Sequence, residues 1–527
     1  MLFIDSPEQH VRQPVEADQA LDECRAVFQA LSVSRSKLEL QKMPAEILDA
    51  IIKLVGAESA RRLCSLCRAF RQISFPYIHT SRKLTILRIP NLHSLDWHLM
   101  RSNEIIKHLT IARQKFMENM MFITRPDVML RIRRLELATA NDVCYRGLLK
   151  LAQVRDVDTV FSVYCRPVVQ GINNLLAGAR HLTTLCFTRI EISSAIVAVM
   201  ADMPALYTLE ILYCDYKLPS ADGDSDKVPS VRNLTLRGKP NERTLHPLAF
   251  LPNVLVLVLA GEPLYSPICL PSDSFRECYN PFSTLERIII QFPEHDETLR
   301  IYDWMCDAIR KFDGLRLTHF KALMQSPLDY LDTEKFVFAL QFAPLRTLVL
   351  DGLWHIPEDL FIELADCPQL EQLTLTYAHY NDTSRAATVW PEPMSQYAEW
   401  LAYLPALRDF AWNYLVDPLA RSGTREYWNE VGYPVVPDGR LPDLRFRDWS
   451  VLARIFVAYC PDLHSLEFLS ERTAILAFTM GPGRDVDGRV TVVSHDLPWN
   501  GSKRQEEMNP NDDVVNTKNA WVVGLDE

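Results

Sequence analysis

The chain reads Leu-Arg-Thr-Leu-Val-Leu at residues 345–350 and Leu-Glu-Gln-Leu-Thr-Leu at residues 370–375. Both stretches follow the pattern L-x-x-L-x-L, in which the last two leucines are separated by a single residue. This spacing is typical of a short strand that buries one face and exposes the other. Because the pattern recurs, we expect a repeat architecture rather than a set of independent domains.

Further copies of the pattern occupy most of the chain, with aliphatic or aromatic residues in place of some leucines. They are Leu84-Leu87-Ile89, Ile106-Leu109-Ile111, Ile132-Leu135-Leu137, Leu182-Leu185-Phe187, Leu206-Leu209-Ile211, Val231-Leu234-Leu236, Val254-Leu257-Leu259, Leu285-Ile288-Ile290, Leu407-Phe410-Trp412 and Leu463-Leu466-Phe468. Weaker copies lie near Val157-Val160 and Leu315-Phe320. This leucine-rich periodicity predicts a stack of about 13 or 14 turns.

Stretches with one apolar face separate many of these copies and predict helices at 193–203, 302–312, 333–342, 357–366, 395–403 and 450–459. We therefore expect an α/β fold, a curved solenoid with parallel strands on its concave side and helices on its convex side. Residues 475–480 and 490–494 are predicted strands that close the array.

Composition narrows the classes of function. The chain has 527 residues, with 48% hydrophobic and 23% charged residues and a net charge of −11. This balance argues against a partner that is nucleic acid or an anionic membrane, since either would call for a basic surface. Neither a signal peptide nor a membrane span is evident, so we expect an intracellular protein, cytoplasmic, nuclear or both, with its 12 cysteines reduced.

A different pattern precedes the repeats. Residues 43–55 read M-P-A-E-I-L-D-A-I-I-K-L-V, and residues 64–77 read C-S-L-C-R-A-F-R-Q-I-S-F-P-Y. Proline fits the first turn of a helix, and apolar residues follow at helical spacing in both segments. Two short amphipathic helices are predicted, and their apolar faces need a cover.

These residues resemble an F-box, the segment that docks a protein on the Skp adaptor of cullin-based ubiquitin ligases. The matching positions are Pro44, Glu46, Ile47, Leu48, Ile51, Cys67, Arg68 and Phe70. The departures are Met43 and Leu66, where the family has leucine and valine, a missing late tryptophan, and arginines at 61 and 62 where the family often has an acidic residue. The resemblance spans about 40 residues, and the Cys-Pro-x-Leu junctions at 367–370 and 460–463 look like the long repeats that accompany F-boxes. An ordinary helical hairpin packed on the repeats is the alternative.

The resemblance implies a set of adaptor-binding residues, namely Met43, Pro44, Ile47, Leu48, Ile51, Leu63, Leu66 and Phe70. The polar strand positions and the aromatic residues late in the array give a second set of candidates, for binding a target protein. They are Arg237, Arg287, Asp351, Trp354, Thr376, Tyr377, Tyr380 and Asn413. Solvated strand faces and core aromatic residues would give the same pattern.

Motifs for catalysis or for cofactor binding are not evident. Cys64-x-x-Cys67 has no second ligand pair at zinc-finger spacing, and it falls in a predicted helix where both cysteines serve as small apolar residues. Signatures of hydrolases, metalloproteases and nucleotide-binding loops are missing from the sequence. We therefore expect no catalytic residue, no metal and no cofactor.

The expected organisation is an N-terminal segment (1–37), an F-box-like domain (38–80), a leucine-rich-repeat solenoid (81–470) with an insertion at about 415–445, a C-terminal cap (471–498) and a mostly disordered tail (499–527). The expected function is the substrate-recognition subunit of a Skp–cullin–F-box-type ligase, with the Skp-type adaptor, the cullin through it and an unidentified target as partners. A repeat scaffold or inhibitor without a ligase role, and a hidden enzyme, are the alternatives.

Overall fold

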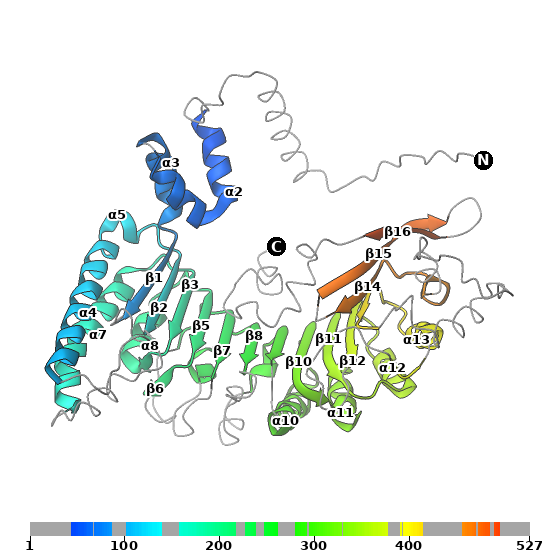
Figure 1. Cartoon of the computed structure of the whole chain (residues 1–527). Coiled ribbons are helices and arrows are strands. Elements are labelled where there is room, and N and C mark those ends of the chain that lie inside the picture. Colours follow the sequence, from blue (N-terminus) through cyan, green and yellow to red (C-terminus); the bar gives the residue numbers. More distant parts are fainter. Residues whose placement is uncertain are drawn as a thin grey trace. The chain divides into compact units, whose positions relative to one another are not determined.

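The computed structural model describes residues 44–66, 68–86, 102–139, 157–217, 227–238, 247–261, 280–291, 295–328, 330–377, 390–392, 394–414, 456–470, 473–484 and 490–495 (Figure 1). The chain divides into two compact units, Met1–Thr80 and Ser81–Glu527. The expected N-terminal segment at 1–37, the insertion at 415–445 and the tail at 499–527 lie outside the described residues.

The first unit contains a helical hairpin of α2 (Ala45–Cys64) and α3 (Arg68–Ile78). Pro44 precedes the first turn, where a missing backbone N–H costs nothing, and its carbonyl accepts from the amide of Leu48 at 3.2 Å. The hairpin has a small core of its own, made of Leu48, Ile52, Ala60, Phe70 and Ile78. The Tyr77 hydroxyl donates to the Asp49 carboxylate at 2.9 Å and so ties the two helices together.

The second unit is built on one fourteen-stranded sheet in which the first twelve strands are parallel. Those strands are β1 (Ser81–Ile86), β2 (Arg134–Thr139), β3 (Thr184–Thr188), β5 (Thr208–Leu212), β7 (Asn233–Arg237), β8 (Val256–Ala260), β9 (Arg287–Gln291), β10 (His319–Leu328), β11 (Thr347–Leu353), β12 (Gln372–Tyr377), β13 (Asp409–Trp412) and β14 (Ser465–Ser470). The predicted α/β class with parallel strands is thereby confirmed, and the order of the strands is compatible with a solenoid-like fold.

Two antiparallel strands, β15 (Thr473–Arg484) and β16 (Val490–His495), complete the sheet at the positions predicted for a cap. A separate two-stranded ladder joins β4 (Glu191–Ser193) to β6 (Asp215–Lys217).

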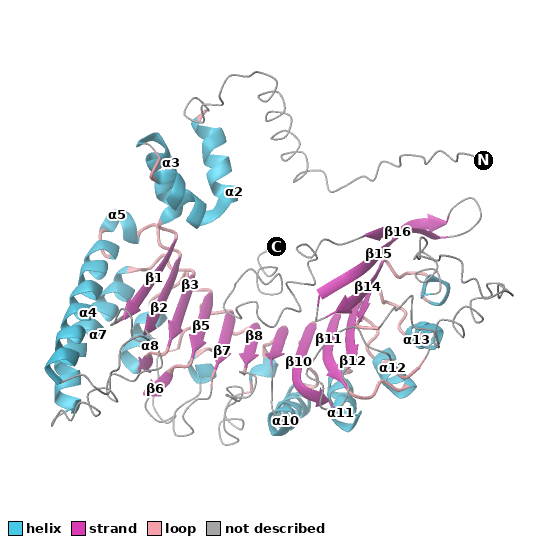
Figure 2. Ribbon diagram, viewed as in Figure 1, coloured by secondary structure: helices cyan, strands magenta, loops and turns pink. Residues whose placement is uncertain are grey.

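The helices of the second unit pack on one face of the main sheet, as Figure 2 shows. They are α4 (Ser102–Ile123), α5 (Pro126–Met129), α7 (Val157–Gly178), α8 (Ser194–Ala201), α10 (His295–Phe312), α11 (Tyr330–Leu340), α12 (Glu358–Ala365) and α13 (Met394–Leu401), with 3₁₀ turns η4 (Pro247–Phe250) and η5 (Pro281–Ser283). The helices predicted at 193–203, 302–312, 333–342, 357–366 and 395–403 are present as α8 and α10 to α13, whereas most of 450–459 is outside the described residues.

In the twelve parallel strands from β1 to β14, the two spaced apolar residues enter a single core that also includes the buried sides of these helices. Leu348 and Leu350 of β11, and Leu373 and Leu375 of β12, are each at most 1% exposed. The alternation of side chains along a strand therefore sends the intervening residues to the opposite face.

A recurring backbone contact sets where each strand begins. The carbonyl of Arg346 accepts from the amides of Glu371 and Gln372 at 2.8 and 2.9 Å, and the carbonyl of Glu371 accepts from Arg408 and Asp409 at 2.7 and 3.0 Å. The same one-carbonyl, two-amide step joins successive strands from β2 to β14. Each strand therefore begins level with the strand before it.

The strand predictions fail at two copies of the repeat and shift at a third. Ile106-Leu109-Ile111 lies in helix α4, and the weak copy near Val157-Val160 lies in helix α7. An i, i+3 spacing of apolar residues suits a helix as well as this repeat, so the pattern could not separate them. In the first copy, Leu84 and Ile86 of β1 point into the core, three residues ahead of the predicted Leu87 and Ile89, which are outside the described residues.

Candidate functional site

Some of the residues that the resemblance assigned to adaptor binding are buried in the helical hairpin, and others are exposed. Leu48 and Phe70 are each 4% exposed and belong to the core of the hairpin, so they hold the two helices together. Ile47 is 40% exposed and Leu66 is 65% exposed. Pro44 is also exposed, Ile51 and Leu63 are half-buried, and Met43 lies outside the described residues. Among the described residues of the hairpin, the large apolar side chains left exposed are therefore Ile47, in the first turn of α2, and Leu66, just after its end.

The second candidate surface is the face of the main sheet opposite the helices, which we call the helix-distal face. The parallel register aligns its residues in rows across the strands. The middle row consists of Lys83, Glu136, Cys186, Glu210, Thr235, Val258, Ile289, Lys321, Val349, Thr374, Ala411 and Glu467. This row is charged over β1 to β5 and becomes mainly aliphatic from β8 onward.

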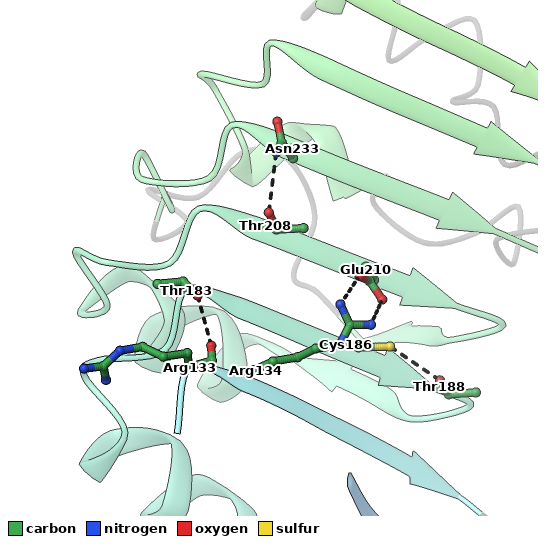
Figure 3. Close-up of polar contacts among 8 residues, drawn as sticks. All are labelled: Arg133, Arg134, Thr183, Cys186, Thr188, Thr208, Glu210 and Asn233. Carbon is green, nitrogen blue, oxygen red and sulfur yellow. Dashed lines mark hydrogen bonds and ion pairs between the residues drawn. The ribbon is translucent and has the colours of Figure 1, made fainter. Parts of the chain in front are cut away.

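At the β1–β5 end, opposite charges are paired. Lys83 forms an ion pair with Glu136 on the next strand. The guanidinium of Arg134 on β2 grips both carboxylate oxygens of Glu210 on β5, at 3.0 and 3.1 Å (Figure 3). This bidentate pair crosses over strand β3, where Cys186 lies beneath it. Two parallel N–H···O bonds fix the geometry as well as the charge.

Burial governs the titration of this group of side chains. Burial raises the pKa of the Glu210 carboxyl, and the adjacent Arg134 opposes that rise. Burial, and then the charge of Glu210, raise the pKa of the Cys186 thiol far above its ordinary value. Since the thiolate is the reactive form of cysteine, Cys186 is an inert, protonated side chain here.

A stack that the sequence did not predict follows the ends of β3, β5 and β7. The guanidinium carbons of Arg189 and Arg237 lie 5.5 and 5.6 Å from the ring centre of Tyr213. Arg189 and Tyr213 both have positive φ, 56° and 55°, as does Gly238 at 91°. Left-handed backbone at non-glycine residues is costly, and it carries no signal in amino-acid type that would reveal it from sequence. Arg237, a predicted target-binding residue, is thus part of this stack.

From β8 to β14 the helix-distal face has its own apolar cluster. Its members are Val258, Ile289, Leu323, Val349, Ala411 and Leu469, all in strands and none more than 4% exposed. Among them lies Lys321, which is 1% exposed. Arg287 and His319 are half-buried on the same face. Burial, followed by the charges of Arg287 and Arg346, lowers the pKa of His319 to about 4. This region therefore combines aliphatic side chains with the basic residues Lys321, Arg287 and His319, and the buried Asp351 lies on the same face of the adjacent strand β11.

Two of the predicted target-binding residues form an internal bond at the end of β11. The Thr376 hydroxyl donates to the Asp351 carboxylate and accepts from the amide of Gly352, the latter at 2.8 Å. Gly352 has φ of 97° at a bulge in the strand pairing, a conformation that glycine adopts without strain. Asp351 and Thr376 are both fully buried, so here they bond within the sheet, and their contact with a target stays a prediction.

Asn413 is likewise a structural residue. Its side-chain amide donates to the carbonyl of Tyr377 at 2.9 Å and accepts from the amide of Tyr377 at 2.8 Å, which extends the pairing of β12 by one residue. The indole N–H of Trp390 also donates to it, at 3.1 Å. With no exposed surface, Asn413 cannot contact a target directly.

The aromatic residues concentrated late in the array are mostly core. Trp390, Tyr397, Trp400 and Trp412 are at most 7% exposed and pack edge to face in one cluster, in which Trp390 and Trp412 have ring centres 5.0 Å apart. Tyr377 ends β12 and packs partly against this core. Trp354 is half-buried after β11, and its ring centre lies 4.8 Å from that of His355, while Tyr380 lies outside the described residues.

Within the part of the chain that the structure describes, no three side chains among His, Cys, Asp and Glu are grouped as metal ligands. None of the helices in those same ranges is long and apolar enough to cross a membrane. No family model matches the sequence, and no curated protein matches it either.

Proposed function

We propose that this chain is the target-recognition subunit of a Skp–cullin–F-box-type ubiquitin ligase, with a leucine-rich-repeat solenoid as its target-binding domain. The observation that carries the proposal is the helical hairpin. It closes its own core around Leu48 and Phe70 yet leaves Ile47 and Leu66 exposed, in the segment that resembles an F-box. Large apolar side chains that stay exposed beside a closed core are available to a partner protein.

In this function the chain makes and breaks no bonds itself. The hairpin would bind the Skp-type adaptor, and the helix-distal face of the repeat sheet would hold the target protein. Holding a target lysine near a ubiquitin-charged enzyme raises its effective concentration, which is the contribution a receptor makes to the transfer.

The test is co-purification of the chain with a Skp-type adaptor. The double substitution Ile47→Asp/Leu66→Asp should reduce adaptor binding at least about tenfold, because charge replaces apolar surface at the contact. Ile362→Asp is the matched control, since Ile362 is 51% exposed on α12 in the other unit, and it should bind as the wild type does. Both variants should melt within a few degrees of the wild type.

A wild-type chain that fails to bind the adaptor would overturn the proposal. The repeat scaffold without a ligase role would then be the better description of the protein.

A further inference from the structure

Two neighbouring helices on the outer side of the array carry large apolar side chains that are exposed. Phe338 on α11 is 50% exposed, and Ile362 on α12 is 51% exposed. Phe342, four residues after Phe338, is 44% exposed, and the two phenyl rings pack edge to face with their centres 5.6 Å apart. These side chains do not contribute to the core beneath the helices and are available to a partner protein.

A hydrogen bond shows which sides of the two helices meet. The side-chain amide of Gln341, just past the end of α11, donates to the backbone carbonyl of Glu363 on α12 at 3.1 Å (Figure 1). Residues three or four positions apart share one side of a helix. Glu334 therefore lies towards this contact on α11, and Asp359 and Asp366 lie towards it on α12. We call this acidic strip between the two helices the α11–α12 seam.

The seam is negative, and its charges repel one another. Burial, and then the charges of Glu334, Asp359 and Asp366, raise the pKa of the Glu363 carboxyl. Glu363 and Asp366 also lie at the C-terminal end of α12, which is the negative end of the helix dipole. Helix α12 contains no basic residue, and Lys335, the one basic residue of α11, is turned by about 100° from Glu334 around the helix axis. A cation supplied by another molecule would therefore stabilise this surface.

Charge complementarity and the exposed apolar residues together indicate the kind of occupant. A second copy of the same surface, or a nucleic acid, would bring like charges together at the seam. An amphipathic helix with lysine or arginine beside its apolar face offers both of the required features, and such helices commonly bind through that apolar face.

We propose that the α11–α12 seam is a docking surface for a basic amphipathic helix of a partner protein. Its apolar side chains would lie on Phe338 and Ile362, and its lysines or arginines would lie beside Asp359 and Glu363. The seam is on the helix side of the sheet, opposite the helix-distal face, so the two surfaces do not compete for one ligand. The inference concerns the repeat unit alone, and it stands whether or not the hairpin binds an adaptor.

The first test uses the full-length chain and a short synthetic helix of lysine and leucine, with the leucines on one face, as the probe. Fluorescence anisotropy should detect binding of this peptide, and a peptide with glutamate in place of each lysine should not bind. A wild-type chain that binds neither peptide would overturn the proposal.

Charge variants separate the seam from a general attraction to a chain whose net charge is −11. Asp359→Asn/Glu363→Gln should weaken binding of the lysine–leucine peptide about fivefold, because two ion pairs are lost. Glu118→Gln/Asp202→Asn is the matched control, since it removes two exposed carboxylates from the α4 and α8 regions, and it should change the affinity less than about twofold. Equal weakening by the two double variants would mean that the peptide does not bind at the seam.

The apolar contact has its own matched pair of variants. Phe338→Ser/Ile362→Ser should weaken binding about tenfold, because the leucines of the peptide lose their contact. Val163→Ser/Val169→Ser removes two side chains of α7 that are 59% and 51% exposed, and it should leave the affinity unchanged. Equal affinities of these two variants would contradict the proposed site.

A measurement on the wild-type chain covers the case in which a variant does not fold. The lysine–leucine peptide is given a photoreactive group at one leucine, and the labelled positions are mapped by mass spectrometry. The label should lie within residues 330–366. Labelling confined to other parts of the chain would overturn the proposal.

Discussion

The two ends of the helix-distal face are made of the same short strands but are stabilised in different ways. Over β1 to β5, cationic and anionic side chains neutralise one another within the sheet, as Arg134 and Glu210 do. Over β8 to β11, aliphatic residues surround Lys321, and Arg287 and His319 lie beside them. One end is dominated by paired charges, whereas the other end buries mainly aliphatic side chains around a lysine. The same strand spacing therefore supports two different ways of filling one face of a sheet.

The largest expected loss of stability tests the paired charges over β1 to β5. Arg134→Met leaves the carboxylate of Glu210, which is 1% exposed, without its cationic partner. Losing one member of a buried pair costs about 3 kcal/mol of the free energy of unfolding at pH 7. The loss should shrink at lower pH, where Glu210 takes up a proton, and chemical unfolding at several pH values measures it.

Arg133→Met is the matched control for that experiment. Arg133 is exposed and bonds only backbone carbonyls among the described contacts, so its loss should cost less than about 1 kcal/mol. The double variant Arg134→Met/Glu210→Leu should recover most of the stability, because it removes both charges. If it is as unstable as Arg134→Met, the pair does not act as a unit.

The next largest effect is a pH dependence of stability that comes from His319 on β10. The pKa of His319 is about 4 in the folded chain, below the value of about 6.5 of an unfolded histidine. The unfolded chain therefore binds more protons between these values, so stability falls as the pH drops from about 6.5 towards 4. After allowance for the partial exposure of His319, the difference is on the order of 2 kcal/mol.

His319→Gln removes this titration. The unfolding free energy of the variant should change less between pH 7 and pH 4.5 than that of the wild type, as denaturant titrations would measure. His181 is exposed, so His181→Gln should retain the wild-type slope. Parallel curves for the wild type and His319→Gln would mean that burial and the charges of Arg287 and Arg346 do not lower the pKa of this histidine.

The smallest effect is expected at the boundary between the two ends. A Cβ at Gly238 would lie 2.8 Å from the Tyr213 ring, and the φ of 91° disfavours any side chain. Gly238→Ala should therefore cost about 1–2 kcal/mol and disturb the Arg189–Tyr213–Arg237 stack. Gly171→Ala, inside helix α7 with only an ordinary contact at 3.6 Å, should be neutral or stabilising. Thermal melts of the two variants compare them directly.

Much of the fold follows from spacing in the sequence, because the repeat L-x-L marks both a strand and its buried face. Ten strands, from β2 at Arg134 to β14 at Ser465, each begin two residues after the first residue of a copy of the repeat. The errors are local: in α4 the apolar residues at i and i+3 fit a helix equally well, and Ile111 proves to be 40% exposed.

The candidate site was harder to predict. Alternation correctly places Asp351 and Thr376 on the helix-distal face, but it does not reveal that they bond each other across two strands. That contact depends on the bulge at Gly352 and on a partner 25 residues away. The burial of Asp351 and Thr376 depends on contacts between neighbouring turns of the array, so it cannot be read from either stretch of sequence alone.

The shared carbonyl that aligns successive strands also makes their alignment independent of the length of the segment that connects them. Arg346 and Glu371 are 25 positions apart and Arg408 and His464 are 56 apart, yet both steps end in the same two-amide grip on one oxygen. The connecting segments can thus become longer or shorter without shifting the side chains on the neighbouring strands. Insertions in the loops therefore change the edge of the sheet while the register of the strands is kept.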